Sequence, residues 1–487
     1  MTTSGRWAGP RSDKAYASYQ EKRRRFWDSH ATPHDTKPAH YYHQRLQRIY
    51  RFLVTSGASV IELGSGDGDL LAALEPERGV GVDFSVANVE LARRRHPDLE
   101  FVNADVQELD LDDKFDYVVI SDLANDVWDI QAMLERVSSL CNPQTRVILN
   151  FFNKAWQLPI GVARGTGLAQ RMLKQNWLSV SDMENLLRVT GFEVISTSGE
   201  ILFPFRVPLV HSLLNRFVVK FWPFNHLALT HFVMARLDPF RHGSAIDTSA
   251  SVSVVVPARN EAGHIHEILE RVPAMGSRTE ILFVEGNSTD DTLAVIKEAV
   301  EAENNPDIRY YQQPGVGKGD AVRHGYEHAT GDVLMILDAD MTVAPEDLPR
   351  FFDAIASGAG EFINGVRLVY PMEDEAMQFL NYLGNKLFGV TFSWLLRQPV
   401  KDTLCGTKVL TRSAYDVIAA NRSYFGDFDP FGDFDLLFGA AKSNMKIVDI
   451  PIRYRQRRYG STNIDRWRHG VLLLKMASFA ARKLRFV

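Results

Sequence analysis

The sequence has little cysteine and no excess of positive charge. Only Cys141 and Cys405 occur in 487 residues, so the chain alone builds neither a disulfide framework nor a four-cysteine zinc site, and a reducing compartment suits it. Lys and Arg number 55 against 60 Asp and Glu, which gives a formal net charge of −5. Proteins dedicated to nucleic acids need an excess of cations for phosphate contacts, so we expect no nucleic-acid partner.

Long apolar runs are also missing. No window of about 18 uncharged apolar residues is present, which argues against a membrane-spanning helix. No signal-like apolar stretch follows Met1, so we expect a cytoplasmic protein. Residues 201–237, 379–396 and 470–487 are apolar but interrupted by cations. Each stretch suits a helix lying in the headgroup layer of a membrane or, alternatively, a helix packed on its own core.

Length and pattern predict two α/β domains. Short apolar segments rich in Val and Ile alternate with helical segments, and we expect strands at residues 59–63, 80–84, 99–103, 117–121, 146–151, 251–257, 280–285, 308–312 and 332–337. This alternation is typical of mostly parallel sheets with helices on both faces. Residues 241–251 are small and polar and predict a linker. We therefore expect domains at residues 1–240, with a helical N-terminal cap, and 252–487.

A glycine-rich turn follows the first predicted strand. Gly64, Gly66 and Gly68 lie between that strand and a helix, where glycine lets the backbone turn sharply and approach a ligand. Asp83 ends the next strand, where a carboxylate can accept both hydroxyls of a ribose, and Asp105 ends the third, where it can accept from an adenine amino group. These features favour an adenosine-type ligand, although an Asp after a strand also serves as a helix cap.

The run Glu62-x-Gly64-x-Gly66-x-Gly68, together with Asp83, resembles the first motifs of class I methyltransferases. The resemblance implies a Rossmann-like sheet and S-adenosylmethionine bound by Glu62, Gly64, Ser65, Gly66, Asp83, Phe84, Asp105 and Val106. It also implies that the methyl group lies near the end of the fourth strand. Asp122, which follows that strand, is a candidate general base toward an acceptor hydroxyl, or else a helix cap.

Polar residues also end the strands of the second predicted domain. Pro257, Asn260 and Glu261 end one strand and Glu285 ends another. Lys318 lies in a glycine-rich loop that suits a phosphate-bearing ligand. The sequence Asp338-Ala339-Asp340 follows four apolar residues, and two carboxylates at this spacing can hold a divalent cation beside a diphosphate.

These segments resemble family 2 glycosyltransferases of the GT-A fold, and within them the dolichol-phosphate and polyprenyl-phosphate mannosyltransferases. The resemblance implies Mg or Mn on Asp338 and Asp340, and a nucleotide-diphosphate sugar bound by Pro257, Asn260, Glu261, Glu285, Lys318, Asp338, Ala339 and Asp340. It assigns phosphate or acceptor binding to Arg367, Asp402 and Lys408. Asp433 is a candidate acid for the acceptor side, and Arg455 and Arg458, from a cluster of four arginines, are candidate charge clamps.

The two resemblances together predict a bifunctional transferase. It would transfer a sugar to a polyprenyl phosphate or a lipid-linked saccharide, and a methyl group to a small-molecule, glycan or lipid acceptor. Such an enzyme would be peripheral on the cytoplasmic face of the membrane. The alternative is a soluble glycosyltransferase for a free metabolite, with the first domain as a regulatory or scaffold module that binds S-adenosylmethionine.

Overall fold

The chain folds into two compact units, which we describe separately. The computed structural model describes residues 14–33, 40–166, 172–242, 249–370, 379–424, 434–455, 459 and 466–486. Unit 1 comprises Met1–His242 with Phe486–Val487, and unit 2 comprises Gly243–Arg485. Residues 243–248 of the expected linker lie outside the described part of the chain.

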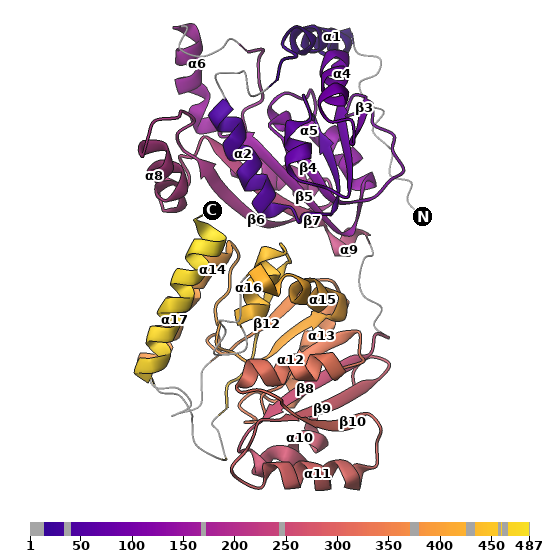
Figure 1. Ribbon diagram of the computed structural model, residues 1–487, viewed down its shortest axis with the longest axis vertical. Coiled ribbons are helices and arrows are strands. Elements are labelled where there is room, and N and C mark those ends of the chain that lie inside the picture. The colour runs from indigo at the N-terminus through magenta and orange to yellow at the C-terminus, as the bar shows by residue number, and fades with distance from the viewer. Residues whose placement is uncertain are drawn as a thin grey trace. The chain divides into compact units, whose positions relative to one another are not determined.

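Unit 1 contains a seven-stranded sheet in the order β3-β2-β1-β4-β5-β7-β6 (Figure 1). The first five strands in this order are parallel, whereas β7 runs antiparallel to both β5 and β6. The strands are β1 (Ser59–Leu63), β2 (Arg78–Asp83), β3 (Glu100–Asn103), β4 (Phe115–Ser121), β5 (Cys141–Phe152), β6 (Phe192–Ile201) and β7 (Thr230–Leu237). The carboxyl ends of the parallel strands therefore share one edge.

Helices cover both faces of this sheet. Neighbouring residues of β1 enter different cores: Val60 packs with Tyr50 of α2, whereas Ile61 packs with Met133 of α5, as expected for a strand buried on both sides. Local sequence fixes several helix starts; Ser85 caps α4 by accepting a hydrogen bond from the Asn88 amide. The helices are α1 (Lys14–Ser29), α2 (His40–Leu53), α3 (Asp69–Ala73), α4 (Val86–Arg95), α5 (Ile130–Ser139), α6 (Gln157–Gly165), α7 (Val180–Val189), α8 (Val210–Arg216) and α9 (Pro239–His242).

The strand predictions for unit 1 are confirmed for β1 to β5, with shifted ends except at β1. The sequence interpretation missed β6 and β7. The expectation of an interfacial or core helix for residues 201–237 is wrong at its C-terminal end, because residues 230–237 form β7 and all eight are buried. Residues 202–229 connect β6 to β7 and include α8.

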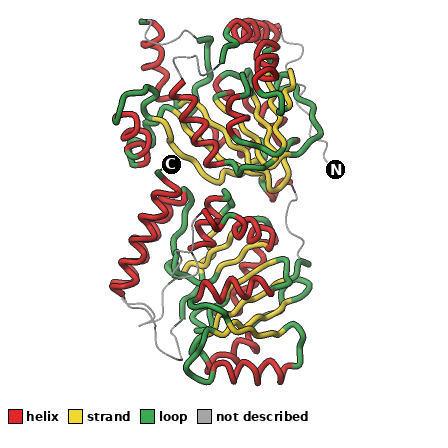
Figure 2. Tube along the Cα trace, in the orientation of Figure 1, coloured by secondary structure: helices red, strands yellow, loops and turns green. Residues whose placement is uncertain are grey.

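Unit 2 also contains a seven-stranded sheet, in the order β10-β9-β8-β11-β13-β12-β14. Figure 2 draws the strands of both units in yellow and the helices in red. Strand β13 is antiparallel to its neighbours β11 and β12, and the other pairs are parallel. The strands are β8 (Val252–Ala258), β9 (Thr279–Glu285), β10 (Ile308–Gln312), β11 (Val333–Ile336), β12 (Phe362–Val366), β13 (Lys408–Thr411) and β14 (Ile447–Pro451). The first four match the predicted strands to within two residues at each end.

The helices of unit 2 include the two apolar stretches noted in the sequence. They are α10 (Ile265–Arg271), α11 (Thr292–Glu303), α12 (Lys318–His328), α13 (Leu348–Ala356), α14 (Phe379–Leu396), α15 (Arg412–Ala420), α16 (Phe434–Lys442) and α17 (Arg466–Ala480). Helices α14 and α17 pack on each other. Among the described residues, no helix combines the length and the apolar character that crossing a bilayer requires.

Candidate functional sites

The glycine turn of unit 1 has a backbone that only glycine adopts readily. Gly64, Gly66 and Gly68 have φ angles of 78°, 54° and 79°, in the left-handed region. A Cβ on Gly64 would lie 3.1 Å from Leu123 Cδ1, and one on Gly68 would lie 2.6 Å from Phe101 Cζ. The turn between β1 and α3 therefore needs these glycines for close packing as well as for conformation.

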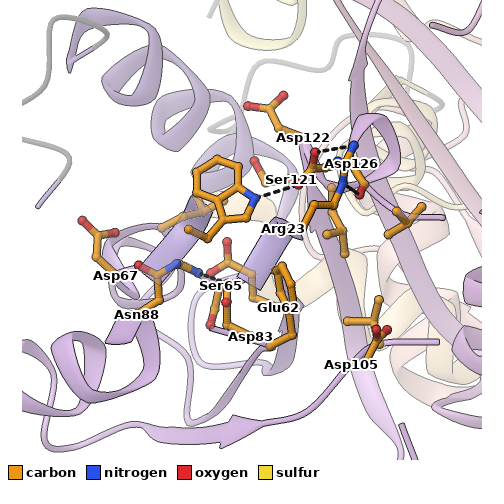
Figure 3. A pocket seen from close by; sticks show the side chains of 18 of the residues that line it. Arg23, Glu62, Ser65, Asp67, Asp83, Asn88, Asp105, Ser121, Asp122 and Asp126 are labelled. Atoms are coloured by element: carbon orange, nitrogen blue, oxygen red, sulfur yellow. Dashed lines mark hydrogen bonds and ion pairs between the residues drawn. The ribbon is translucent and has the colours of Figure 1, made fainter. Parts of the chain in front are cut away.

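A pocket opens beside this turn at the carboxyl edge of the sheet (Figure 3). Glu62 Oε2 and Ser65 Oγ are buried there and have no hydrogen-bond partner in the described structure. Burial, and then repulsion from Asp67, raises the pKa of Glu62 well above its ordinary value. A buried polar atom without a partner is costly, so the pocket suits a ligand that brings hydrogen-bond donors.

Asp83 connects the glycine turn to the next helix. Its carboxylate accepts hydrogen bonds from the amides of Gly66, at 2.9 Å, and Ser85, at 2.8 Å. Burial raises the pKa of Asp83 to about 6, although these two amides act against the shift. The carboxylate lines the pocket, where each of its oxygens has a second lone pair for a ligand hydroxyl.

Asp105 is at the same pocket but is already engaged by protein donors. Tyr16 and Gln20 of α1 donate to its Oδ2 at 3.2 and 2.6 Å, and the side chain and amide of Gln107 donate to its Oδ1. An adenine amino group would have to displace one of these donors. The adenine-binding role of Asp105 stays a prediction. The other predicted cofactor residues that line the pocket are Gly64, Gly66, Phe84 and Val106.

Helix α1 covers the pocket, and its aromatic pair Tyr16 and Tyr19 predicts from the sequence either a lid on the cofactor or a helix packed on the domain. Asp126 anchors the helix: Arg23 pairs with its carboxylate at 3.1 Å, and Trp27 Nε1 donates to it at 2.7 Å. Tyr19 donates to the Asp126 carbonyl at 2.8 Å. Tyr19, Arg23 and Trp27 all line the pocket. No motif signals the anchoring by Asp126, because these contacts join residues about 100 positions apart.

Asp122 follows β4 and also lines the pocket. Its φ of 56° is in the left-handed region, which costs energy for a residue other than glycine and is common at functional sites. Tyr42 and Asn150 each donate to its Oδ1, at 2.9 and 2.5 Å. The cap alternative has no support at η2 (Leu123–Asn125), where Asp122 makes no side-chain cap hydrogen bond.

The second site is at the carboxyl ends of β9, β8 and β11, which are adjacent in unit 2. Glu285, at the end of β9, is buried and accepts a hydrogen bond from the Ser288 amide. Asn260, after β8, has a φ of 58° and accepts from the Thr289 amide at 2.8 Å. Glu261 pairs with His264 at 3.0 Å. Pro257 lies within β8 itself.

The two carboxylates after β11 have different surroundings. Asp338 pairs with Lys318 at 2.6 Å, and Asp340 accepts from the amide and hydroxyl of Thr342 at 3.1 and 2.7 Å. Burial, and then the Asp338 charge, raises the pKa of Asp340. A Cβ on Gly406 would lie 1.9 Å from Asp338 Oδ2. Two oxygen donors of this kind fit a hard divalent cation.

The predicted phosphate-binding residues make internal contacts. Arg367 forms a bidentate pair with Asp402 at 2.7 and 2.9 Å. Although burial raises the pKa of Asp402, the Arg367 guanidinium holds it below its ordinary value. Lys408 is fully buried and donates to Asn364 and to the Cys405 carbonyl. Direct phosphate contacts by Arg367 and Lys408 therefore stay predictions, and both cations already have protein partners.

The remaining predicted residues divide into two groups. The Arg455 amide donates to the Thr342 carbonyl at 3.0 Å, so the backbone of this arginine lies beside the loop that contains Asp338 and Asp340. Asp433 and Arg458 lie outside the described residues.

A separate group on α12, His324, Glu327 and His328, brings its nitrogen and oxygen atoms within 4.8 Å of one another, so it offers a second set of metal ligands.

Comparison with known families agrees with both folds. Residues 39–197 match the model of a methyltransferase domain, and residues 253–418 match that of glycosyl transferase family 2. The first match includes the glycine turn, and the second includes the acidic loop with Asp338 and Asp340. The chain therefore carries a methyltransferase domain followed by a family 2 glycosyltransferase domain, both of them transferase enzyme domains.

Curated relatives align with part of the chain. Glycosyltransferase AglJ of Haloferax volcanii is 28% identical over 228 residues, which are 46% of this chain and 70% of that protein. Undecaprenyl-phosphate 4-deoxy-4-formamido-L-arabinose transferase of Klebsiella pneumoniae is 37% identical over 103 residues, 20% of this chain and 32% of that protein. The chain thus spans only about a third of the second relative.

Solved structures resemble each half at low identity. A SAM-dependent methyltransferase from Thermotoga maritima has 16% identity and a TM-score of 0.33, covering 39% of this chain and 87% of its own. Glucosyl-3-phosphoglycerate synthase from Mycobacterium tuberculosis, with Mn²⁺ and UDP, has 17% identity and a TM-score of 0.36, covering 48% and 80%. Both likenesses are too distant to assign a substrate.

Proposed function

We propose that the chain is a bifunctional transferase. The glycosyltransferase domain would move a sugar from a nucleotide-diphosphate donor to a polyprenyl phosphate or a lipid-linked saccharide. The methyltransferase domain would methylate a hydroxyl of a small molecule, glycan or lipid. The observation that carries the proposal is the group of Asp338, Asp340 and Lys318 at the sheet edge where β9 also ends with the buried Glu285.

Sugar transfer needs charge stabilisation more than a strong base. A phosphate oxygen of the acceptor would attack the anomeric carbon while the bond to the diphosphate oxygen breaks. The diphosphate leaves with the electron pair, so cations must neutralise its charge. Lys318 and Arg455 are near the acidic loop, and Mg or Mn on Asp338 and Asp340 would add Lewis-acid stabilisation.

The polyprenyl acceptor is supported by likeness and by surface character. The Klebsiella relative is named for transfer to undecaprenyl phosphate. Helices α14 and α17 expose Leu387, Val390, Val471 and Leu474, and cations flank them, as in helices that lie on anionic membranes. We therefore propose a peripheral membrane enzyme that acts on the cytoplasmic face.

Methyl transfer is supported by the pocket of unit 1. S-adenosylmethionine would supply an electrophilic methyl group there, and the unpartnered Glu62 Oε2 and Ser65 Oγ would accept its donors. Asp83 would accept from the ribose hydroxyls. Asp122, held by Tyr42 and Asn150, would accept the proton of the acceptor hydroxyl.

The decisive experiment is a donor screen with polyprenyl phosphate as acceptor, measuring release of nucleoside diphosphate. Asp338→Ala/Asp340→Ala should reduce sugar transfer by about a thousandfold or more, because the leaving charge loses its stabilisation. Mn²⁺ binding should fall in the same variant. His328→Ala is the matched control, since it removes the other metal-ligand group and should leave sugar transfer unchanged. Full activity of the double variant would refute the metal assignment.

A further inference from the structure

The connection between β6 and β7 carries an unusual surface. Of the twenty-four large apolar side chains that the described part of the chain exposes, ten lie between residues 205 and 227. Leu209 is 85% exposed, Trp222 78% and Phe205 63%. A soluble monomer rarely exposes a contiguous apolar patch of this kind unless a partner covers it. We call residues 203–227 the β6–β7 surface.

Buried polar contacts hold this segment in place. Asn215 is buried, and its side chain donates to the Phe203 carbonyl at 2.7 Å and accepts from two amides. Arg45 of α2 donates to the Asn215 carbonyl at 3.2 Å. Lys220 and Glu200 form a fully buried ion pair. The backbone is thus fixed from inside the unit. Phe217 and Phe221 also contact Phe486 at ring-centroid distances of 5.1 and 6.3 Å, whereas Phe205, Leu209 and Trp222 remain exposed.

One exposed position is also strained. Leu209 directly precedes α8 and has a φ of 64°, which is unfavourable for a residue other than glycine. A strained leucine that is 85% exposed gains nothing from packing within the unit. Burial of its side chain in an external apolar phase would offset that cost.

The charge of the segment indicates which kind of apolar phase covers it. Residues 201–237 contain no Asp or Glu, and Arg206 and Arg216 are exposed. Aromatic and aliphatic side chains beside arginines, without carboxylates, complement the interface of an anionic bilayer. We propose that the β6–β7 surface docks the methyltransferase unit on an anionic phospholipid membrane. This docking does not rest on the proposed reactions.

Vesicle flotation of the full chain tests the proposal. With vesicles of phosphatidylglycerol and phosphatidylcholine, Leu209→Ser/Trp222→Ser should weaken binding by about tenfold or more, because two apolar side chains leave the bilayer. Leu158→Ser/Val162→Ser on α6 is the matched control, since these residues of the same unit are also 81% and 67% exposed. The control should float like the unmodified chain.

Three further measurements keep the outcome clear. Arg206→Gln/Arg216→Gln should remove most of the salt dependence of binding. Lipids with brominated acyl chains should quench fluorescence less in Trp222→Phe than in the unmodified chain. Val471→Ser/Leu474→Ser isolates the contribution of α17.

Unchanged flotation of the Leu209/Trp222 variant would overturn the proposal. A shift of that variant from dimer to monomer in sedimentation, without a lipid effect, would also overturn it by assigning the surface to a second copy of the chain.

Discussion

Asp83 is the residue whose ionisation should control cofactor binding. Its pKa of about 6 follows from burial, so lowering the pH through 6 protonates the carboxylate and removes an acceptor for the ribose hydroxyls. We predict that S-adenosylmethionine affinity falls as the pH drops below 6. Asp83→Asn should lower affinity about tenfold to a hundredfold at pH 7.5, because hydrogen bonds to a charged group are lost.

Calorimetric titration over a range of pH measures this effect. The Asp83→Asn variant should show no step near pH 6. A step that persists in the variant would assign the titration to Glu62, whose pKa is also raised by burial. The free energy of unfolding depends on pH in the opposite direction from the cofactor affinity. Because folding raises the pKa of the Asp83 carboxyl, unit 1 becomes less stable as the pH rises toward 6.

Gly406 is the residue that permits the Asp338–Lys318 pair. A methyl group there would lie 1.9 Å from Asp338 Oδ2 and 2.2 Å from Lys318 Nζ, so one of them must move. We predict that Gly406→Ala lowers the kcat of sugar transfer by about a hundredfold, with weaker Mn²⁺ binding. Gly384→Ala in α14 is the control, because its Cβ would meet no atom within 4 Å. Equal activity of the two variants would contradict the prediction.

At the scale of elements, helix α1 should govern the release of the cofactor. Asp126→Asn removes the charge that pairs with the buried Arg23, and an uncompensated buried charge costs about 3–5 kcal/mol. Detachment of α1 would relieve this cost without unfolding the sheet. We expect S-adenosylmethionine to dissociate at least about tenfold faster, measured by stopped-flow fluorescence.

A surface position on the same helix provides the comparison. Glu21→Ala breaks only an exposed pair with Arg25, which contributes little, so its dissociation rate should match that of the unmodified chain. If Asp126→Asn releases the cofactor at the unmodified rate and residues 14–29 keep their resistance to proteolysis, α1 does not close the pocket.

The elements also show where sequence patterns suffice. Strands β1, β8, β9 and β11 were predicted closely because buried strands read as continuous apolar runs rich in Val and Ile. Strand β6 (Phe192–Ile201) was missed because its sequence, with Glu193, Ser196 and Ser198, is not a continuous apolar run. Strand β7 was missed because residues 201–237 are mostly apolar, so neither a period of two nor one of 3.6 stands out. Only the pairing of β7 with β5 and β6 identifies it as a strand.

For the whole molecule, each unit has its own hydrophobic core. One cluster contains only residues of unit 2, and two others contain only residues of unit 1. We therefore predict two calorimetric transitions. S-adenosylmethionine at about a hundred times its Kd should raise one midpoint by about 5 °C or more. A nucleoside diphosphate with Mn²⁺ should raise the other. A single transition shifted by both ligands would contradict this.

The sequence by itself determined which chemical groups stand at the two sheet edges. The carboxyl ends of parallel strands meet at a common edge. Because Asp83, Asp122, Glu285 and Asp338 each end or follow a predicted strand, the sequence places them at the edges of their sheets. Tertiary structure decided what surrounds them. Three contacts join residues that are distant in sequence. Helix α1 packs against Asp126, Gly406 lies against Asp338, and Arg367 pairs with Asp402. Such contacts follow from packing, which leaves no periodic or spacing signal in the chain.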